Sequence, residues 1–164
     1  MQNLKNLLKR PLKPIPISLV ISIFVVALIG FADAAYLTIE HFRGIVPPCT
    51  LTSGCEQVLT SSYSVVFGVP VALLGALFYL LVAAGAFAYL EGKHEKIFRY
   101  SQAITIFGLL ASVWFVFLQV FILHSYCLYC MVSALTSTIL FVLACILFKK
   151  YNLPDQDFSL PPTK

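Results

Sequence analysis

Charged residues are scarce in this chain of 164 residues: Asp, Glu, Lys and Arg together make up 11% of it, against about 25% in an average soluble domain. Apolar residues make up 60% instead. With so few charges, a chain of this size cannot cover a soluble globule with polar surface, which excludes an ordinary soluble enzyme. A disordered chain and a nucleic-acid binder are excluded for the same reason, despite a net charge of +4. An integral membrane protein of one domain remains.

Four apolar stretches are each long enough to cross a bilayer, which takes about 20 residues as a helix. They cover roughly residues 17–42, 69–90, 103–123 and 126–148. Helices are expected because every backbone amide inside the membrane must be paired within its own segment. The sequence therefore predicts an all-α integral membrane protein, a four-transmembrane-helix bundle over residues 17–148.

Polar segments flank and join these stretches. A basic leader covers residues 1–16, an outer loop residues 42–68, a short connection residues 91–102, and a tail residues 149–164. The tail contains three prolines and is expected to be disordered. A cleavable signal peptide ending near Ala32 is the alternative for the first stretch. Its apolar run of 18 residues exceeds the roughly 7–15 of a signal peptide, so we expect an uncleaved span.

Basic residues are split very unevenly between the two predicted sides of the membrane. Ten fall on the side of the leader, the 91–102 connection and the tail, and one falls on the other side. Because cytoplasmic segments carry the excess of Lys and Arg, both termini are predicted to be cytoplasmic. The ten are Lys5, Lys9, Arg10, Lys13, Lys93, Lys96, Arg99, Lys149, Lys150 and Lys164, and the one is Arg43.

Four of the five cysteines are predicted to lie on the outer face. Cys49 and Cys55 fall in the 42–68 loop, and Cys127 and Cys130 open the fourth stretch. The outer face is the oxidising one for a bacterial or secretory-pathway protein, and disulfides persist there. Cys145 lies about 22 Å deeper along its helix, so we interpret it as a packing residue.

Cys127 and Cys130 form a C-x-x-C pair at a predicted helix start. The spacing puts both sulfurs on one helical face, and the helix N-terminus favours the thiolate that attacks disulfides. Ser125 is the expected N-cap, and the pair is expected to be accessible from the surface. Cys49 and Cys55 lie in a turn-rich loop that can close or open a disulfide. Two pairs on one face indicate a relay that takes electrons from a soluble thiol and passes them inward.

Two other interpretations of the cysteines remain open. Two disulfides could serve as structural cross-links in a non-catalytic membrane protein, or four thiolates could hold a structural zinc ion. The first is disfavoured because a membrane bundle already has its own core. The second is disfavoured because an oxidising compartment does not preserve four free thiolates, so we expect no metal.

The cysteine pairs and their neighbours resemble the vitamin K epoxide reductase family, and most closely its bacterial branch, over residues 15–150 or so. The residues that carry the resemblance are Cys49-x5-Cys55, Ser61, Phe67-Gly68-Val69-Pro70 and Cys127-x-x-Cys130. DsbB-type oxidases also combine four spans with two cysteine pairs, but their C-x-x-C comes before the loop pair. The order in this sequence favours the first family.

The resemblance implies a quinone-dependent thiol oxidase that generates disulfide bonds. Its partner would be a periplasmic thioredoxin-like (DsbA-like) protein, and its electron acceptor ubiquinone or menaquinone in a bacterial inner membrane. Cys49 would exchange with the partner and Cys55 with Cys127. The residues implied at the quinone are Cys130, Ser61, Tyr63, Phe67 and Gly68, with a short surface helix over residues 61–68 capping the pocket.

Two positions depart from the animal members of the family. Val71 stands where they have a substrate-binding asparagine, and Ala134 where they have a tyrosine. Both favour quinone reduction over the alternative, a vitamin K quinone or epoxide reductase. Some bacterial members carry a fused thioredoxin-like domain. Here we expect the partner to be separate, because the sequence stops at Lys164.

Other polar and aromatic residues in the spans are ambiguous from sequence. Asp33 falls near the outer end of the first span, where we expect it to be solvated or locally paired, with a proton or pocket role as the minor alternative. His124 is expected to be an interfacial residue rather than a proton shuttle. Trp114, Phe115 and Phe117 could line a quinone pocket or face lipid.

Overall fold

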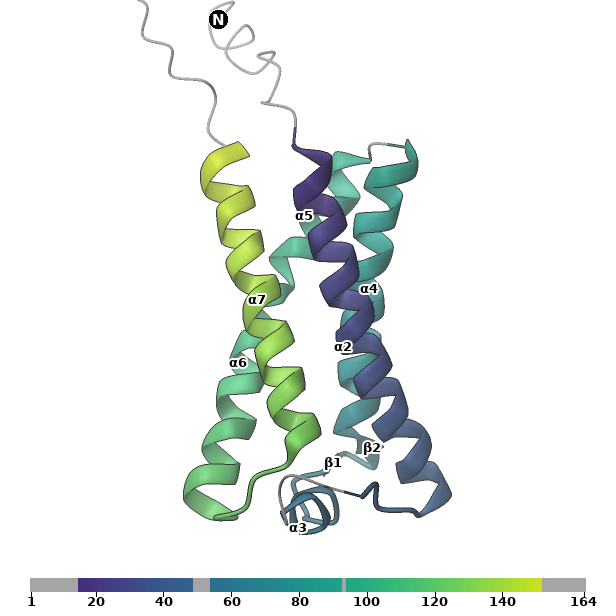
Figure 1. Cartoon of the computed structure of the whole chain (residues 1–164), viewed down its shortest axis with the longest axis vertical. Helices are drawn as coiled ribbons and strands as arrows, with labels where there is room; N and C mark the ends of the chain where they lie inside the picture. The colour runs from purple at the N-terminus through teal and green to yellow at the C-terminus, as the bar shows by residue number, and fades with distance from the viewer. Residues whose placement is uncertain (1–14, 49–53, 93, 152–164) are drawn as a thin grey trace, which may run out of the picture.

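Four long helical segments form an upright bundle in the computed structural model, which describes residues 15–48, 54–92 and 94–151 (Figure 1). The segments are α2 (Ile17–Arg43), α4 (Val71–Gly92), the run from α5 to η1 (Glu95–Ile122) and α7 (Leu128–Tyr151). Each is long and apolar enough to cross a membrane. The predicted all-α membrane bundle is therefore confirmed.

The two ends of the bundle differ. Ile15 and Tyr151, the first and last described residues, lie at one end, and the short helix α3 (Cys55–Leu59) lies at the other (Figure 1). Residues 1–14 and 152–164 lie outside the described residues. The fourth helix runs to Tyr151, three residues beyond the predicted end of the membrane domain. Of the predicted 149–164 tail, residues 149–151 are thus helical.

The third span begins earlier than the sequence predicts. Residues expected to form a short connection belong instead to α5 (Glu95–Ala103), which α6 (Thr105–Phe117) and the π-helical turn η1 (Leu118–Ile122) continue. The polar composition of α5 concealed it, since only one face is buried, through Phe98, Ser101 and Gln102. At Gly85 of α4 a Cβ atom would lie 2.0 Å from Ser101 Oγ, so the absence of a side chain allows α5 to pack closely.

Tyr79 of α4 joins three helices in the core. Its hydroxyl donates to the carbonyl oxygen of Ser133 (2.7 Å) and lies 2.8 Å from Thr136 Oγ1, both on α7. Its ring packs on Gly30 of α2, where a Cβ would lie 2.3 Å from the ring. A buried polar group in a membrane bundle must find its partners inside the protein, and these bonds satisfy it.

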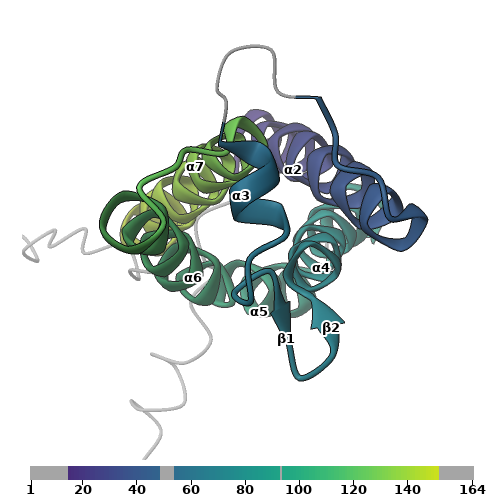
Figure 2. The same cartoon turned by 90° about the horizontal axis from the view of Figure 1, so that it is seen from below.

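The loop between α2 and α4 does not contain a helix at residues 61–68, so that prediction is wrong. The short helix is α3, and it lies across the end of the bundle (Figure 2). Residues 61–64 form turns in which the Ser61 and Ser64 hydroxyls donate to backbone carbonyls. The hairpin of β1 (Val65–Val66) and β2 (Val69–Pro70) follows. Phe67 and Gly68 have φ of 51° and 80°, which a right-handed helix does not allow.

Candidate dithiol site and membrane cavity

The C-x-x-C pair lies at the start of α7, as predicted. Cys127 directly precedes the helix and accepts the Met131 N–H at its carbonyl (3.0 Å), and Cys130 lies in the first turn. The Cys130 thiol donates a hydrogen bond to the Cys127 sulfur, and the N–H groups of Cys130 and Tyr129 also point to it. These donors, the thiol first, lower the pKa of Cys127 from 9.0 to about 7. Thiolate formation at the helix N-terminus is thus favoured as expected.

Cys127 is shielded from solvent, contrary to the expectation of surface access. It is 0% exposed and shares a small apolar cluster with Cys55 (1% exposed) and Val58. Both of the latter belong to α3, which therefore covers the dithiol. A soluble protein cannot reach Cys127 while α3 is in this position.

Two contacts hold α3 against the turn between η1 and α7. Gly54 lies against the backbone of Tyr126, since a Cβ at Gly54 would be 2.7 Å from the Tyr126 nitrogen. The Ser125 hydroxyl donates to Gln57 Oε1 of α3. Ser125 is therefore not the N-cap of α7, as the sequence suggested, because its side chain is engaged across the interface and the helix begins three residues later.

Gln119, which sequence reasoning missed, holds the backbone of Cys127 through a side-chain hydrogen bond. It lies in η1, is 2% exposed, and its Oε1 accepts the backbone N–H of Cys127 (2.8 Å). The backbone carbonyl of Gln119 accepts the backbone N–H of Ser125 (3.1 Å). The only signal in the sequence was an amide side chain within an otherwise apolar run. The register of the π-helical turn, which directs it to Cys127, leaves no such signal.

We expect Gln119→Leu to destabilise the reduced dithiol, because it leaves the buried Cys127 N–H without an acceptor, at a cost of about 1–3 kcal/mol. The shift should appear as a changed midpoint when the Cys127–Cys130 pair is equilibrated with a thiol redox buffer. Phe121→Leu changes an exposed residue of the same π-helical turn, so it is the matched control and should keep the wild-type midpoint. Equal midpoints for Gln119→Leu and the wild type would contradict this role.

A cavity of about 690 Å³ lies beside the dithiol, between the four spans and the α2–α4 loop. This is the size of pocket that holds a small organic ligand. Its walls include three of the predicted quinone-site residues, Cys130, Ser61 and Tyr63. The structure therefore brings the inner thiol and the loop residues to one space inside the membrane domain.

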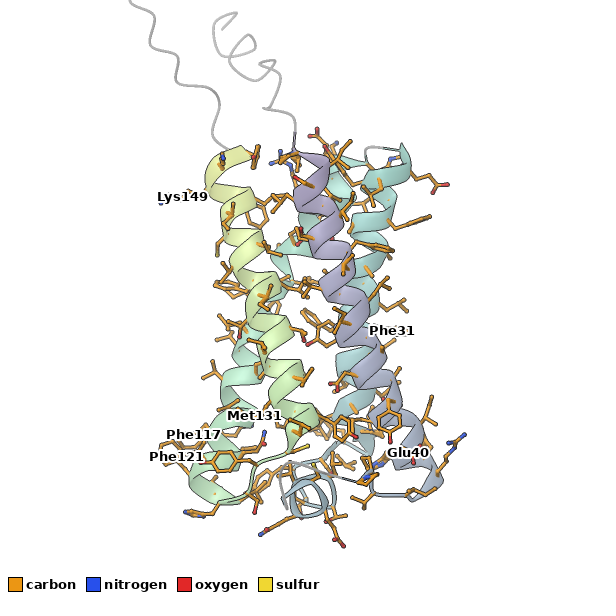
Figure 3. The ribbon with its side chains drawn as sticks, viewed as in Figure 1. Phe31, Glu40, Phe117, Phe121, Met131 and Lys149 are labelled. Carbon is orange, nitrogen blue, oxygen red and sulfur yellow. The ribbon has the colours of Figure 1, made fainter. Side chains whose placement is uncertain are left out.

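The remaining two predicted residues lie elsewhere. Phe67 is fully exposed at the hairpin tip, and neither it nor Gly68 lines the cavity. Their positive φ angles belong to the turn of the hairpin, where both residues are exposed. Of the aromatic residues in α6, Phe115 lines the cavity. Trp114 is exposed, as is Phe117, whose ring points away from the bundle beside Phe121 (Figure 3).

The cavity wall is largely apolar, with one carboxylate. Val71 and Ala134, the two positions that differ from the animal proteins, both line it. Asp33 of α2 lines it as well, and its Oδ2 is buried with no hydrogen-bond partner among the described residues. The residue itself is half-buried, so the expectation of a solvated Asp33 stays a prediction. His124 is exposed on the turn before α7, with φ of 48°.

The other cysteines are accounted for as far as the structure describes them. Cys55 is disulfide-bonded, and Cys49 lies outside the described residues. Cys127, Cys130 and Cys145 are free thiols, and Cys145 is exposed on the surface of the bundle. Within residues 15–48, 54–92 and 94–151, no group of three or more His, Cys, Asp or Glu side chains is placed to hold a metal ion.

A C-x-x-C pair at the head of a transmembrane helix, with the disulfide-bonded Cys55 packed against its first cysteine, is the arrangement expected of a membrane thiol oxidoreductase. The model of the vitamin K epoxide reductase family matches residues 21–145, and the chain belongs to this family. It is also similar to the thiol-disulfide oxidoreductase LTO1 of Arabidopsis thaliana, with 37% identity over 120 residues. The match covers 68% of this chain and 32% of that protein, so the chain spans about a third of the length of this relative.

Proposed function

We propose that the protein oxidises a periplasmic thioredoxin-like (DsbA-like) protein and passes the two electrons to ubiquinone or menaquinone. The observation that carries this proposal is the separation of the two inner thiols. Cys127 faces Cys55 in a buried cluster, whereas Cys130 faces the membrane cavity. Electrons can therefore enter on one side of the C-x-x-C and leave on the other.

The route begins at the outer pair, where we propose that the disulfide of Cys55 is made with Cys49. The partner's dithiol reduces this disulfide through Cys49 and is itself oxidised. The freed Cys55 thiolate then attacks Cys127 in the oxidised inner pair, a Cys55–Cys127 bond forms, and Cys130 leaves as a thiolate. Cys49 resolves the mixed disulfide, which regenerates the outer disulfide and leaves Cys127 and Cys130 reduced. Both are free thiols in this structure.

The cavity suits a quinone ring by size and polarity, with Cys130, Ser61 and Tyr63 in its wall. A bound quinone would accept two electrons and two protons and leave as a quinol. Cys130 would present its sulfur to the ring, the apolar wall would exclude water, and Cys127 would close the disulfide on Cys130. Epoxide reduction is disfavoured, because Val71 and Ala134 offer no side-chain hydrogen bond where the animal members of the family have an asparagine and a tyrosine.

We further propose that the dithiol end of the bundle faces the periplasm of a bacterial inner membrane. Lys149 lies at the opposite end from Glu40 and Met131 (Figure 3), and ten of the eleven basic residues are assigned by sequence to that opposite side. Residues 1–16 and 149–164 would then be cytoplasmic flanks of the membrane domain.

The purified protein in lipid nanodiscs should reduce a short-chain ubiquinone or menaquinone analogue when dithiothreitol is supplied. One quinol should form per dithiol oxidised, because both changes involve two electrons, and mass spectrometry should find a Cys127–Cys130 disulfide after quinone is added to reduced protein. Cys145→Ala is the matched control and should behave as wild type. If quinone leaves all thiols reduced and no quinol forms, the proposed function is wrong.

A further inference from the structure

Among the described residues, Asp33 is the one carboxylate in the cavity wall, and the route described above does not use it. It lies within α2, ten residues before the helix ends at Arg43. Ionisable residues inside membrane spans are costly, and those that persist there generally serve a pathway for protons, ions or substrate. Its position in the same cavity wall as Cys130 suggests the proton pathway of the dithiol.

Asp33 has no cation to hold it in a structural ion pair within the described part of the chain. The two ion pairs found there join Arg43 to Glu40 and Arg99 to Glu95. Asp33 Oδ2 is buried and lacks a hydrogen-bond partner among those same residues. One oxygen of this carboxylate therefore remains available to accept a proton.

Titratable groups face Asp33 from the neighbouring elements. Tyr79 comes from α4, and Cys130 and Tyr129 come from α7, with Cys127 just before it. The Tyr79 hydroxyl donates to the Ser133 carbonyl.

His41 and Tyr63 also line the cavity, and the other titratable residues of the same helix are Tyr36, Glu40 and Arg43. Among all the groups that face Asp33, the thiols are the ones that must lose protons during turnover.

The thiols and Asp33 act on each other electrostatically. A negative charge on Asp33 opposes the formation of a thiolate at Cys127. A thiolate and a carboxylate therefore coexist poorly in this wall. Transfer of a proton from a thiol to Asp33 removes this conflict, because one negative charge replaces another.

We propose that Asp33 carries a proton from the dithiol to the quinone, which deepens the proposed function and rests on it. Cys130 gives its thiol proton to the Asp33 carboxylate and becomes a thiolate. Two electrons leave as the Cys127–Cys130 bond forms, and Asp33 returns its proton to a quinone oxygen. The second proton comes from Cys127. The sum is one dithiol and one quinone converted to one disulfide and one quinol, with Asp33 again ionised.

Asp33→Asn tests this proposal, since it preserves size but cannot exchange the proton. With menaquinone and ubiquinone analogues in nanodiscs, kcat should fall about 100-fold, the usual contribution of a positioned proton-transfer group. KM for the quinone should change less than about threefold. Asp33→Glu should recover part of the rate. Glu40→Gln removes a buried carboxylate of the same helix that does not line the cavity, and it should retain wild-type kcat.

A second measurement needs no quinone. Because the charge on Asp33 raises the pKa of Cys127, Asp33→Asn should move the titration of the Cys127 thiolate to lower pH in the reduced protein, as followed by ultraviolet absorbance. An unmoved titration, or a kcat of Asp33→Asn within about threefold of wild type while the wild type reduces quinone, overturns the role of Asp33 alone. A wild-type protein that exchanges thiols but never reduces quinone overturns the proposed function and this proposal together.

Discussion

Replacing Cys130 with alanine is expected to stop quinone reduction and to trap a disulfide between Cys55 and Cys127. Cys127 can still attack the outer disulfide at Cys55 and release Cys49 as a thiolate, but no thiol remains to form the inner disulfide or to face the cavity. Only the return of Cys49 can then release Cys127. Turnover should fall at least about 10³-fold, as it does when a covalent nucleophile is removed from other enzymes. Peptide mapping under non-reducing conditions should detect the Cys55–Cys127 pair, and Cys145→Ala serves as the control.

The same variant has a pH signature. Cys130 donates the hydrogen bond that contributes most to lowering the pKa of Cys127 from 9.0 to about 7. Without that donor the pKa rises toward its ordinary value, so the thiolate fraction at pH 7 falls from roughly one half to as little as about 1%. In a titration of reduced protein, the thiolate absorbance should rise at higher pH than in wild type. An unchanged midpoint, or the absence of the trapped disulfide, would contradict the assigned roles.

Gly54→Val is expected to separate the two cysteine pairs. A Cβ at residue 54 would lie 2.7 Å and 2.9 Å from the backbone nitrogen and oxygen of Tyr126, which cannot rotate away. Overpacking of this kind costs up to about 3 kcal/mol, so α3 should move and turnover with the partner should fall about 100-fold. A membrane-impermeant maleimide should then modify Cys127, which is 0% exposed in the present structure.

Glu56→Ala provides the control for this variant, because Glu56 is exposed on the same short helix. It should leave turnover and Cys127 labelling at wild-type values. Wild-type turnover in Gly54→Val would show that close contact between α3 and Tyr126 is not needed for exchange.

The sequence predicted the features that depend on the composition and spacing of residues within single segments. Runs of apolar residues identified the four spans. The C-x-x-C spacing located the dithiol and indicated a lowered thiol pKa, because it places the second thiol and the N–H groups of the first helical turn near Cys127. The start of the third span was missed, because α5 is rich in polar residues and only one of its faces is buried. The loop was predicted less well, because the turns at Ser61 and Ser64 and the positive φ of Phe67 depend on local hydrogen bonds.

The site residues found only in the structure depend on tertiary contact. Gln119 contacts Cys127 because a π-helical turn shifts its register, and hydropathy carries no record of that shift. Asp33 lies 94 residues from Cys127 in the sequence, and its exposure to the cavity depends on how α2 packs against α4 and α7. A charge near a span end is expected by default to reach water, which is why the sequence interpretation placed it there.

The burial of Cys127 and Cys55 beneath one face of α3 has a consequence for selectivity. Small thiols such as glutathione occur alongside soluble redox proteins. If the inner pair were exposed, they could reduce it directly, and their electrons would pass to the quinone without the formation of any protein disulfide. With α3 in this position, small thiols in solution cannot reach Cys127 directly. Under the proposed route, the only electrons admitted are those that first pass through Cys49 and Cys55.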